Sequence, residues 1–258
     1  MSNPTDIFER IPEFGHSEPP LETNSEEFER VVRSRRSTRV YTDDPIPENI
    51  MKRCLELALL APNSSNLQPW EFYWVRDVEK KARLAKLCLG QPAATTAQEL
   101  VVCVARMDTW DRNRKLMLQK MEESPSDYPD AAFTYYRKLA RFAYSQGPLS
   151  IFGPLKKLVF WTLALRKPMP RGPAGKADMR VWAHKSTALG CQNLMLSLRA
   201  FGFDSCPMEG MDGTRIRKLL QLPRSAEICM VISAGKRAEN GIYGEQLRFD
   251  RSLFVYEV

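Results

Sequence analysis

Two polar stretches near the N-terminus carry the side chains best suited to bind a ligand. Residues 35–41 read RRSTRVY and place three arginines and two hydroxyls within seven positions, directly after a helical pattern ends. Residues 61–70 read APNSSNLQPW and lead straight into an apolar strand pattern. Taken alone, an arginine cluster is usually a solvated face and Asn-Ser-Ser-Asn is usually a turn. Together they supply the guanidinium, hydroxyl and amide donors that an anionic, flat ligand accepts.

Composition excludes several other kinds of site. The chain has 258 residues, of which 43% are hydrophobic, so it can bury a sizeable core. Its six cysteines lack a CxxC pair and predict reduced, buried thiols in a cytoplasmic protein. His16 and His184 are the only histidines, which is too few for a histidine-rich metal set, and no GxSxG elbow supports a serine hydrolase. The N-terminus lacks the basic and apolar regions of a signal peptide.

The helical elements follow from caps and apolar periodicity. Asn24 and Glu27 resemble a capping box for a first helix that ends at the arginine cluster. Pro47 suits the first turn of a second helix, which Pro62 ends, and Asp77 caps a helix that runs to about Leu89. Further helices are predicted over residues 110–122, 131–145, 155–165, 179–201 and 212–220.

Short apolar runs predict the strands. They cover residues 71–76, 98–106 and 228–234, with a last strand at 252–258, which reads SLFVYEV. Residues 203–211, including Cys206-Pro207-Met208-Glu209-Gly210, are predicted as a loop. This order of helices and strands lacks regular βαβ alternation and any GxGxxG, so it favours an α+β layer architecture over a Rossmann fold.

Four motifs in this order resemble those of the flavin-dependent nitroreductase family. They are RRSTR, PNSSNLQPWEF, QNLMLSLRAFGFDSCPMEGMD and an arginine ahead of the terminal segment. The resemblance covers roughly residues 25–106 and 180–258. It implies an α+β fold with a central, mostly antiparallel sheet flanked by helices. It also implies an N-terminal arm over 1–24, one domain over 25–258, a helical insert or lid over 107–179 and a C-terminal arm over 235–258.

The same resemblance implies a flavin mononucleotide (FMN) site between the subunits of a homodimer. Arg35, Ser37 and Arg248 match phosphate contacts, although Gln246 stands where relatives often carry lysine. Arg36 matches a contact to the ring edge, while Arg39 and Asn66 match groups beside the edge that becomes negative on reduction. The backbone near flavin N5 is matched by Pro207, Met208, Glu209 and Gly210, and a main-chain N–H of Glu209 or Gly210 is expected to bond N5.

The implied activity is hydride transfer from NAD(P)H through flavin N5 to a nitroaromatic, a quinone or another small electron-poor acceptor, with ping-pong kinetics. Alternatives on this fold are a dehalogenase, a dehydrogenase or a flavin-binding protein without turnover. Neither the physiological acceptor nor the choice between NADH and NADPH follows from the sequence. For His184, packing or surface exposure is favoured over a role in the substrate pocket.

The insert contains the basic part of the chain. Residues 131–180 carry ten Lys or Arg against the single acid Asp178, so this segment holds +9 and the remainder −2. Three interpretations stay open: a lid packed on the dimer, a basic lid that selects an anionic or apolar substrate, and a weak contact with a membrane surface. A nucleic-acid partner is not expected, because the charges are spaced among bulky apolar groups and form no known binding motif.

Overall fold

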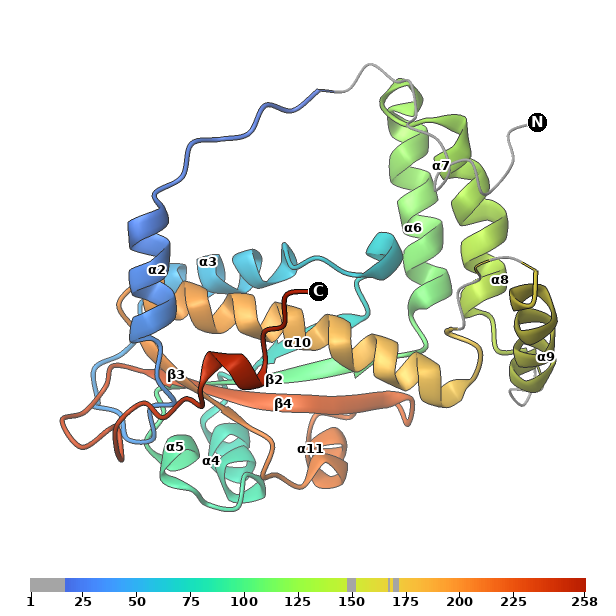
Figure 1. Ribbon diagram of the computed structural model, residues 1–258. Helices are drawn as coiled ribbons and strands as arrows, with labels where there is room; N and C mark the ends of the chain where they lie inside the picture. The colour runs from blue at the N-terminus through green and yellow to red at the C-terminus, as the bar shows by residue number, and fades with distance from the viewer. Residues whose placement is uncertain (1–16, 148–151, 167, 169–171) are drawn as a thin grey trace.

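The computed structural model describes residues 17–147, 152–166, 168 and 172–258, and its centre is a four-stranded antiparallel sheet (Figure 1). The strand order is β1 (Trp70–Trp74), β2 (Glu99–Arg106), β4 (Ala226–Gly235), β3 (Asp204–Met208). All three strand pairs are antiparallel. The expected α+β architecture with a mostly antiparallel sheet is therefore confirmed.

Helices cover both faces of this sheet, as the unbroken run of buried residues along β2 requires, because successive side chains point to opposite faces. Val101 and Cys103 pack toward α3 (Glu48–Leu59) and α10 (Lys176–Ala200). Leu100, Val102 and Val104 belong to the core on the opposite face, under α4 (Val78–Leu87), α5 (Pro92–Thr95) and α11 (Gly213–Leu219). Figure 1 shows the two helical layers on either side of the strands.

Side-chain caps begin three of the helices. The Asn24 side chain accepts the Glu27 N–H at the start of α2 (Ser25–Ser34), and Asp77 accepts the Lys80 N–H at the start of α4. Both caps were expected from the sequence. Asp212 does the same for the Arg215 N–H of α11. Each cap satisfies one backbone donor that the first turn of a helix leaves unpaired.

The insert forms a helical subassembly at one end of the sheet (Figure 1). It contains α6 (Trp110–Glu123), η2 (Pro125–Asp127), α7 (Asp130–Thr134), the π-helical turn η3 (Tyr135–Ala140), α8 (Arg141–Tyr144) and α9 (Phe152–Ala164). Aromatic packing helps to link it to the main core, since the Tyr144 ring lies 4.8 Å from that of Trp182 in α10. Leu67, beside η1 (Ser64–Asn66), is fully buried in the same cluster.

Two sequence predictions were wrong. Most of the segment predicted as the loop 203–211 is strand β3, which pairs with β4 and places Pro207 opposite Ile232. The terminal residues 252–258 form no strand: η5 (Arg251–Leu253) is followed by irregular chain. A segment with alternating apolar residues forms a strand only where a neighbouring strand can pair with it. Among the described residues of this chain, no strand pairs with the tail.

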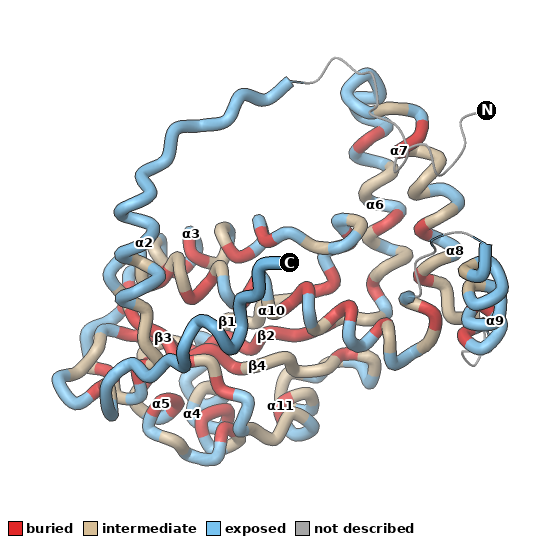
Figure 2. Tube along the Cα trace, in the orientation of Figure 1, coloured by how far each residue is buried: buried red, intermediate tan, exposed pale blue. Residues whose placement is uncertain are grey.

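The terminal segments lie on the surface (Figure 2). Helix α2 has no buried residue, and Phe28 is 63% exposed. In the tail, Phe249 and Phe254 are 81% and 65% exposed. Among the described residues, no helix is both long and apolar enough to cross a bilayer.

Candidate functional site

The arginine cluster and the C-terminal segment enclose a small pocket of about 170 Å³. It brings together four of the residues predicted from RRSTR, plus Arg248. The full lining is Arg35, Arg36, Ser37, Arg39, Ile242, Tyr243, Gly244, Glu245, Gln246, Leu247 and Arg248. Its polar groups are mostly cationic or amide donors, with Glu245 as the one acid in the lining.

Backbone pairing holds the cluster in place on both sides. Ser37 forms a parallel bridge with Ser205 of β3, and the Thr38 N–H donates to the Ser205 carbonyl at 3.2 Å. On the other side, the Arg39 N–H donates to the Gly241 carbonyl at 2.7 Å. The cluster is thus an extended segment between the sheet edge and the chain that follows β4, which fixes where its side chains emerge.

The positive charge of this pocket exceeds its negative charge, because four arginines line it and Glu245 is the one acid in the lining. Burial lowers the pKa of Arg35, and the charges of Arg248 and Arg36 lower it further. The buried Asp204 lies close by, but it already pairs with Arg199 at 3.2 Å and with Arg237 at 2.6 Å. A bound anion would relieve the mutual repulsion of the three arginines, so the electrostatics favour a phosphate-like group here.

Arg36 and Arg39 point to different neighbours. Arg36 donates to the Gly244 carbonyl, which ties it to the C-terminal segment. Arg39 donates to the Ser37 carbonyl at 3.3 Å, and its guanidinium lies 5.3 Å from the centre of the Tyr243 ring. The Arg39 guanidinium is therefore exposed and held by a stacking contact instead of an acid.

The predicted residues 207–210 begin in β3 and continue past its end. Pro207 is half-buried and Met208 buried, whereas Glu209 and Gly210 are exposed. The Gly210 carbonyl accepts a hydrogen bond from Gln91 Nε2 at 3.1 Å. A Cβ added at Gly210 would meet its nearest atoms at 3.8 Å, so the surrounding chain does not itself require glycine there.

Asn66 lies away from the arginine pocket within one chain. It belongs to η1, at the opposite end of α3 from the arginine cluster (Figure 1), and the 12 residues of α3 span about 18 Å. Its Oδ1 accepts from Asn63 Nδ2 at 3.3 Å and from Gln68 Nε2 at 3.4 Å. The two polar stretches that the sequence suggested for one ligand are therefore not brought together by a single chain.

A second hollow of about 540 Å³ opens beside η1. Its lining includes Asn63, Ser64, Trp182 and Lys185, the last two from α10. The Trp182 indole Nε1 is buried without an acceptor among the described residues. Sequence reasoning missed this site because Trp182 fits the apolar stripe of a core helix.

His184 lies in the α10 packing contact with β4. Its Nε2 lies 3.1 Å from Glu227 Oε2, and Glu227 also pairs with Arg180. Hydrogen bonding to Cys229 and to Glu227 raises the pKa of His184 above its ordinary value, against the effect of burial. These contacts match the structural role that the sequence favoured for this residue.

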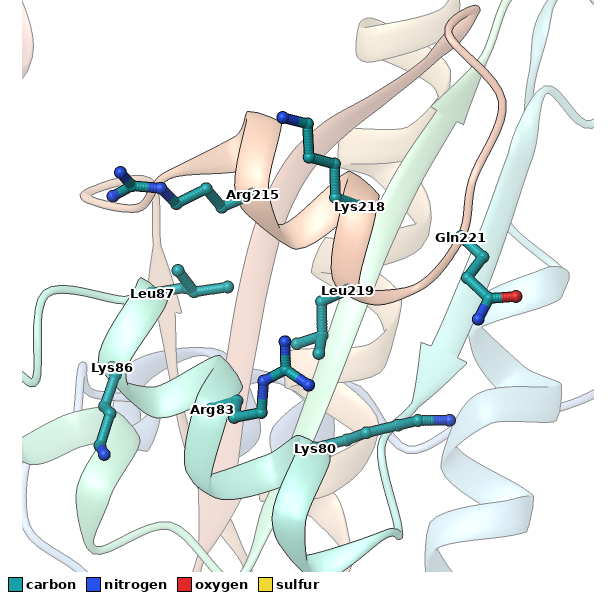
Figure 3. Close-up of a pocket in the computed structure, with 8 residues that line it drawn as sticks. All are labelled: Lys80, Arg83, Lys86, Leu87, Arg215, Lys218, Leu219 and Gln221. Atoms are coloured by element: carbon teal, nitrogen blue, oxygen red, sulfur yellow. The ribbon is translucent and has the colours of Figure 1, made fainter.

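Another cationic hollow, about 610 Å³, lies between α4 and α11 (Figure 3). The basic side chains there diverge: Lys86 and Arg215 extend away from one another, and the Arg83 guanidinium alone lies toward Leu219. Diverging, solvated cations form no cradle for a single anion, so no ligand is assigned to this hollow. Within the described parts of the chain, no group of histidine, cysteine and acidic residues could hold a metal ion.

Comparisons of the sequence with known proteins all point to one family. The profile of the Nitroreductase family matches residues 32–236. The chain is 28% identical over 217 residues to an NADH dehydrogenase of Thermus thermophilus, covering 84% of this chain and 90% of that protein. It is 24% identical over 238 residues to a 4-nitrobenzoate reductase of Pseudomonas putida, covering 89% and 93%.

A solved nitroreductase-type structure from Exiguobacterium sibiricum, in complex with FMN, superposes with a TM-score of 0.65. The two chains share 22% identity over 93% of this chain and 99% of that one, a likeness that shows the fold. With the family profile spanning most of the chain, and the arginine pocket where the motif placed it, the chain belongs to the nitroreductase family of oxidoreductases.

Proposed function

We propose that this protein is an FMN-dependent oxidoreductase that takes hydride from NAD(P)H and passes it to a small electron-poor acceptor. The observation that carries the proposal is the pocket in which Arg35, Arg36 and Arg248 converge, with cations in excess over the single acid of the lining, Glu245. Bound FMN would supply the two-electron carrier, since none of the twenty side chains accepts hydride reversibly. The donor set fits its phosphate, which takes arginine forks and a hydroxyl.

Each residue then has one task in the site. Arg35, Arg248 and the Ser37 hydroxyl hold the phosphate, and Arg36 approaches the ring edge. Arg39, an exposed cation, would stabilise the negative charge that reduction of the bound ring produces and would thereby raise its potential. The backbone of Glu209 and Gly210 would line the region of N5, and an N–H donor from this segment would orient the ring.

A second copy of the chain completes the site in this proposal. Asn66 and the hollow beside η1 lie at the far end of α3 from the arginine pocket, so one chain presents two separate half-sites. The exposed apolar side chains of α2 and the tail, Phe28, Phe249 and Phe254 among them, supply surface for such an association. Within a homodimer, Asn66 of one subunit would then face the arginines of the other.

The acceptor class stays broad. The Pseudomonas putida relative is a 4-nitrobenzoate reductase, which makes nitroaromatic acids the first acceptors to try, followed by quinones. Nicotinamide and acceptor would use the same exposed ring face in turn, which gives ping-pong kinetics. In this proposal the helical insert would cover that face as a lid, and the protein would act in the cytoplasm.

Absorption spectroscopy of the purified protein tests the proposal. We expect a flavin spectrum, or uptake of added FMN, and anaerobic bleaching on titration with NADH or NADPH. Re-oxidation by 4-nitrobenzoate or benzoquinone should then restore the spectrum. Arg35→Gln should weaken FMN binding by about tenfold or more, whereas Arg33→Gln, which removes an exposed arginine of α2, should not.

Two results would refute it. A colourless protein that binds no FMN rejects the flavin site, and a flavoprotein that neither nicotinamide bleaches is a passive binder. The dimer is tested separately by light scattering on the full chain and on a chain ending at Arg248, which keeps that phosphate contact and lacks Phe249 and Phe254. Loss of both dimer and FMN in the shortened chain is expected, and a full-length monomer that binds FMN tightly would contradict the shared site.

A further inference from the structure

A third hollow, inside the insert, combines apolar walls with basic side chains. It measures about 590 Å³ and lies between the η3–α8 run and α9. Its lining is Arg137, Lys138, Arg141, Phe142, Ser145, Phe152, Leu155, Lys156 and Val159. Four cations and four apolar side chains line this hollow, and no acid does.

The spacing shows that two helical faces oppose one another. Residues 137, 138, 141, 142 and 145 recur at helical intervals along η3 and α8, as do 152, 155, 156 and 159 along α9. The apolar groups come mainly from α9, and the cations mainly from the facing run. A ligand that matches this hollow would thus place an apolar body against α9 and a negative charge against the facing run.

Lys156 fixes a positive charge at the base of this hollow. The residue is 3% exposed, and its Nζ donates to the Ala143 carbonyl at 2.9 Å and to the Ser145 carbonyl at the end of α8. Burial lowers the pKa of this ammonium, and within the described chain no carboxylate pairs with it. Nζ also lies 5.6 Å from the Phe142 ring centre, so its described contacts are two backbone carbonyls and one aromatic ring.

Two further cations are also unpaired. Arg137 binds Glu122 at 2.9 Å, but Lys138 and Arg141 have no acidic partner among the residues that the structure describes. The positive charge around the hollow therefore exceeds what nearby acids neutralise. Lys138 and Arg141 are exposed, whereas Lys156 is buried, and a buried charge without a counter-ion is unfavourable.

Close packing holds the start of α9 beside the hollow. The Phe152 ring lies against Gly147, where an added Cβ would come within 2.6 Å of it, and Gly153 lies against the Ala174 carbonyl. These contacts anchor the first turn of α9. Leu155 remains 59% exposed, so apolar surface inside the hollow is open to a ligand.

We propose that this hollow is a binding site for a small amphiphilic anion, a molecule with an apolar body and one acidic head such as a medium-chain fatty acid. The tail would lie on Phe152, Leu155 and Val159, and the head would face Lys138, Arg141 and the Lys156 ammonium. The volume suits a ligand of this size. The site is separate from the arginine pocket and does not depend on the flavin function.

Calorimetric titration of the full chain with octanoate tests the site, with 1-octanol as the uncharged analogue. We expect saturable binding of one octanoate that weakens with added salt, and binding of 1-octanol at least about tenfold weaker. The double substitution Lys138→Gln and Arg141→Gln should weaken octanoate by about tenfold or more and change 1-octanol by less than about twofold. Both residues are exposed, so this variant should fold.

Two pairs of neighbours on α9 provide matched controls. Leu155→Ser should weaken the binding of both ligands. Leu158 is 58% exposed but outside the hollow, so Leu158→Ser should weaken the binding of neither. Lys156→Met should weaken octanoate, whereas the exposed Lys157→Met should not. If Lys156→Met fails to fold, the double variant of Lys138 and Arg141 and the two leucine variants decide.

Three outcomes overturn the proposal. One is the absence of saturable octanoate binding, and another is equal loss in the Leu155 and Leu158 variants. The third is binding only to vesicles that contain phosphatidylglycerol, with no binding of free octanoate, because the insert would then bind an anionic lipid surface and not a single molecule.

Discussion

Thr38 and Ser205 share a backbone hydrogen bond of 3.2 Å, and each has a buried hydroxyl oxygen that finds no partner within the described chain. The bond attaches the arginine cluster to the sheet edge. The two hydroxyls contribute nothing to it, and burying them without partners costs stability. The function of this contact thus lies in the backbone, which explains how a polar segment can hold three cations in a fixed place.

The Thr38 hydroxyl should be dispensable for stability. Thr38→Val keeps the shape and removes an unsatisfied group, so we expect the free energy of unfolding to rise by about 1 kcal/mol. Thr187 is the matched control, since it is equally buried but donates to the Ala183 carbonyl at 2.8 Å. Thr187→Val should lower stability by about 1 kcal/mol. Denaturant unfolding measures both, and a clear loss for Thr38→Val would mean that its hydroxyl has a partner.

Arg39 should affect turnover more than FMN retention. Arg39→Ala removes the cation beside the developing negative charge, so we expect kcat/KM with NADH to fall by about tenfold or more and the flavin potential to become more negative. Arg53 is the control, because it lies 5.2 Å from the Phe201 ring in the same kind of contact but away from the pocket. Arg53→Ala should leave both quantities unchanged. Full activity in Arg39→Ala would exclude the assigned role.

Gly190 permits the close packing of α10 on α3 and β1. A Cβ at this position would come within 2.8 Å of the Phe72 ring and 3.3 Å of the Ala58 carbonyl. Gly190→Ala should therefore lower the free energy of unfolding by about 1–3 kcal/mol. Gly244→Ala, where an added Cβ meets nothing within 4 Å, should change it little. Equal melting temperatures for the two variants would contradict this packing.

His184 should make stability depend on pH. Its pKa is raised in the folded state, so its contribution is complete below the usual histidine value of about 6.5 and is lost as pH rises through the folded-state value. The effect should stay under about 1 kcal/mol because the pair with Glu227 is partly exposed. Unfolding from pH 5.5 to 8.5 should show His184→Gln losing most at the acidic end. A larger loss at pH 8.5 would reverse the sign and reject this account.

Sequence patterns among neighbouring residues predicted much of the fold. Features that depend on a distant pairing partner were not predicted. Caps such as Asn24 and Asp77 and the buried strand β2 depend on residues close in sequence, so their patterns suffice. Strand β3 was missed because a proline inside DSCPM indicates a loop unless the strand lies at a sheet edge. The tail was predicted as a strand because its alternation says nothing about whether a neighbour exists.

The candidate site also has a part that the sequence predicted and a part that it did not. The arginines of RRSTR converge because adjacent residues and one strand edge position them, and this part was predictable from the motif. The position of Asn66 depends on the length and direction of α3, which no motif encodes. Trp182 and Lys185 were missed because the helical pattern that contains them resembles ordinary core packing.

Pro207 has a consequence for how copies of this chain can meet. The Ser205 carbonyl points outward to Thr38, and because hydrogen-bonding groups alternate along a strand, the nitrogen of Pro207 faces the same outer side. That nitrogen carries no hydrogen, so β3 offers an incoming strand no donor there. Open sheet edges readily recruit other chains into cross-molecular sheets, and proline is one protection against it. The chain can therefore expose apolar terminal segments for a helical or arm-like association while keeping this edge of its sheet resistant to aggregation.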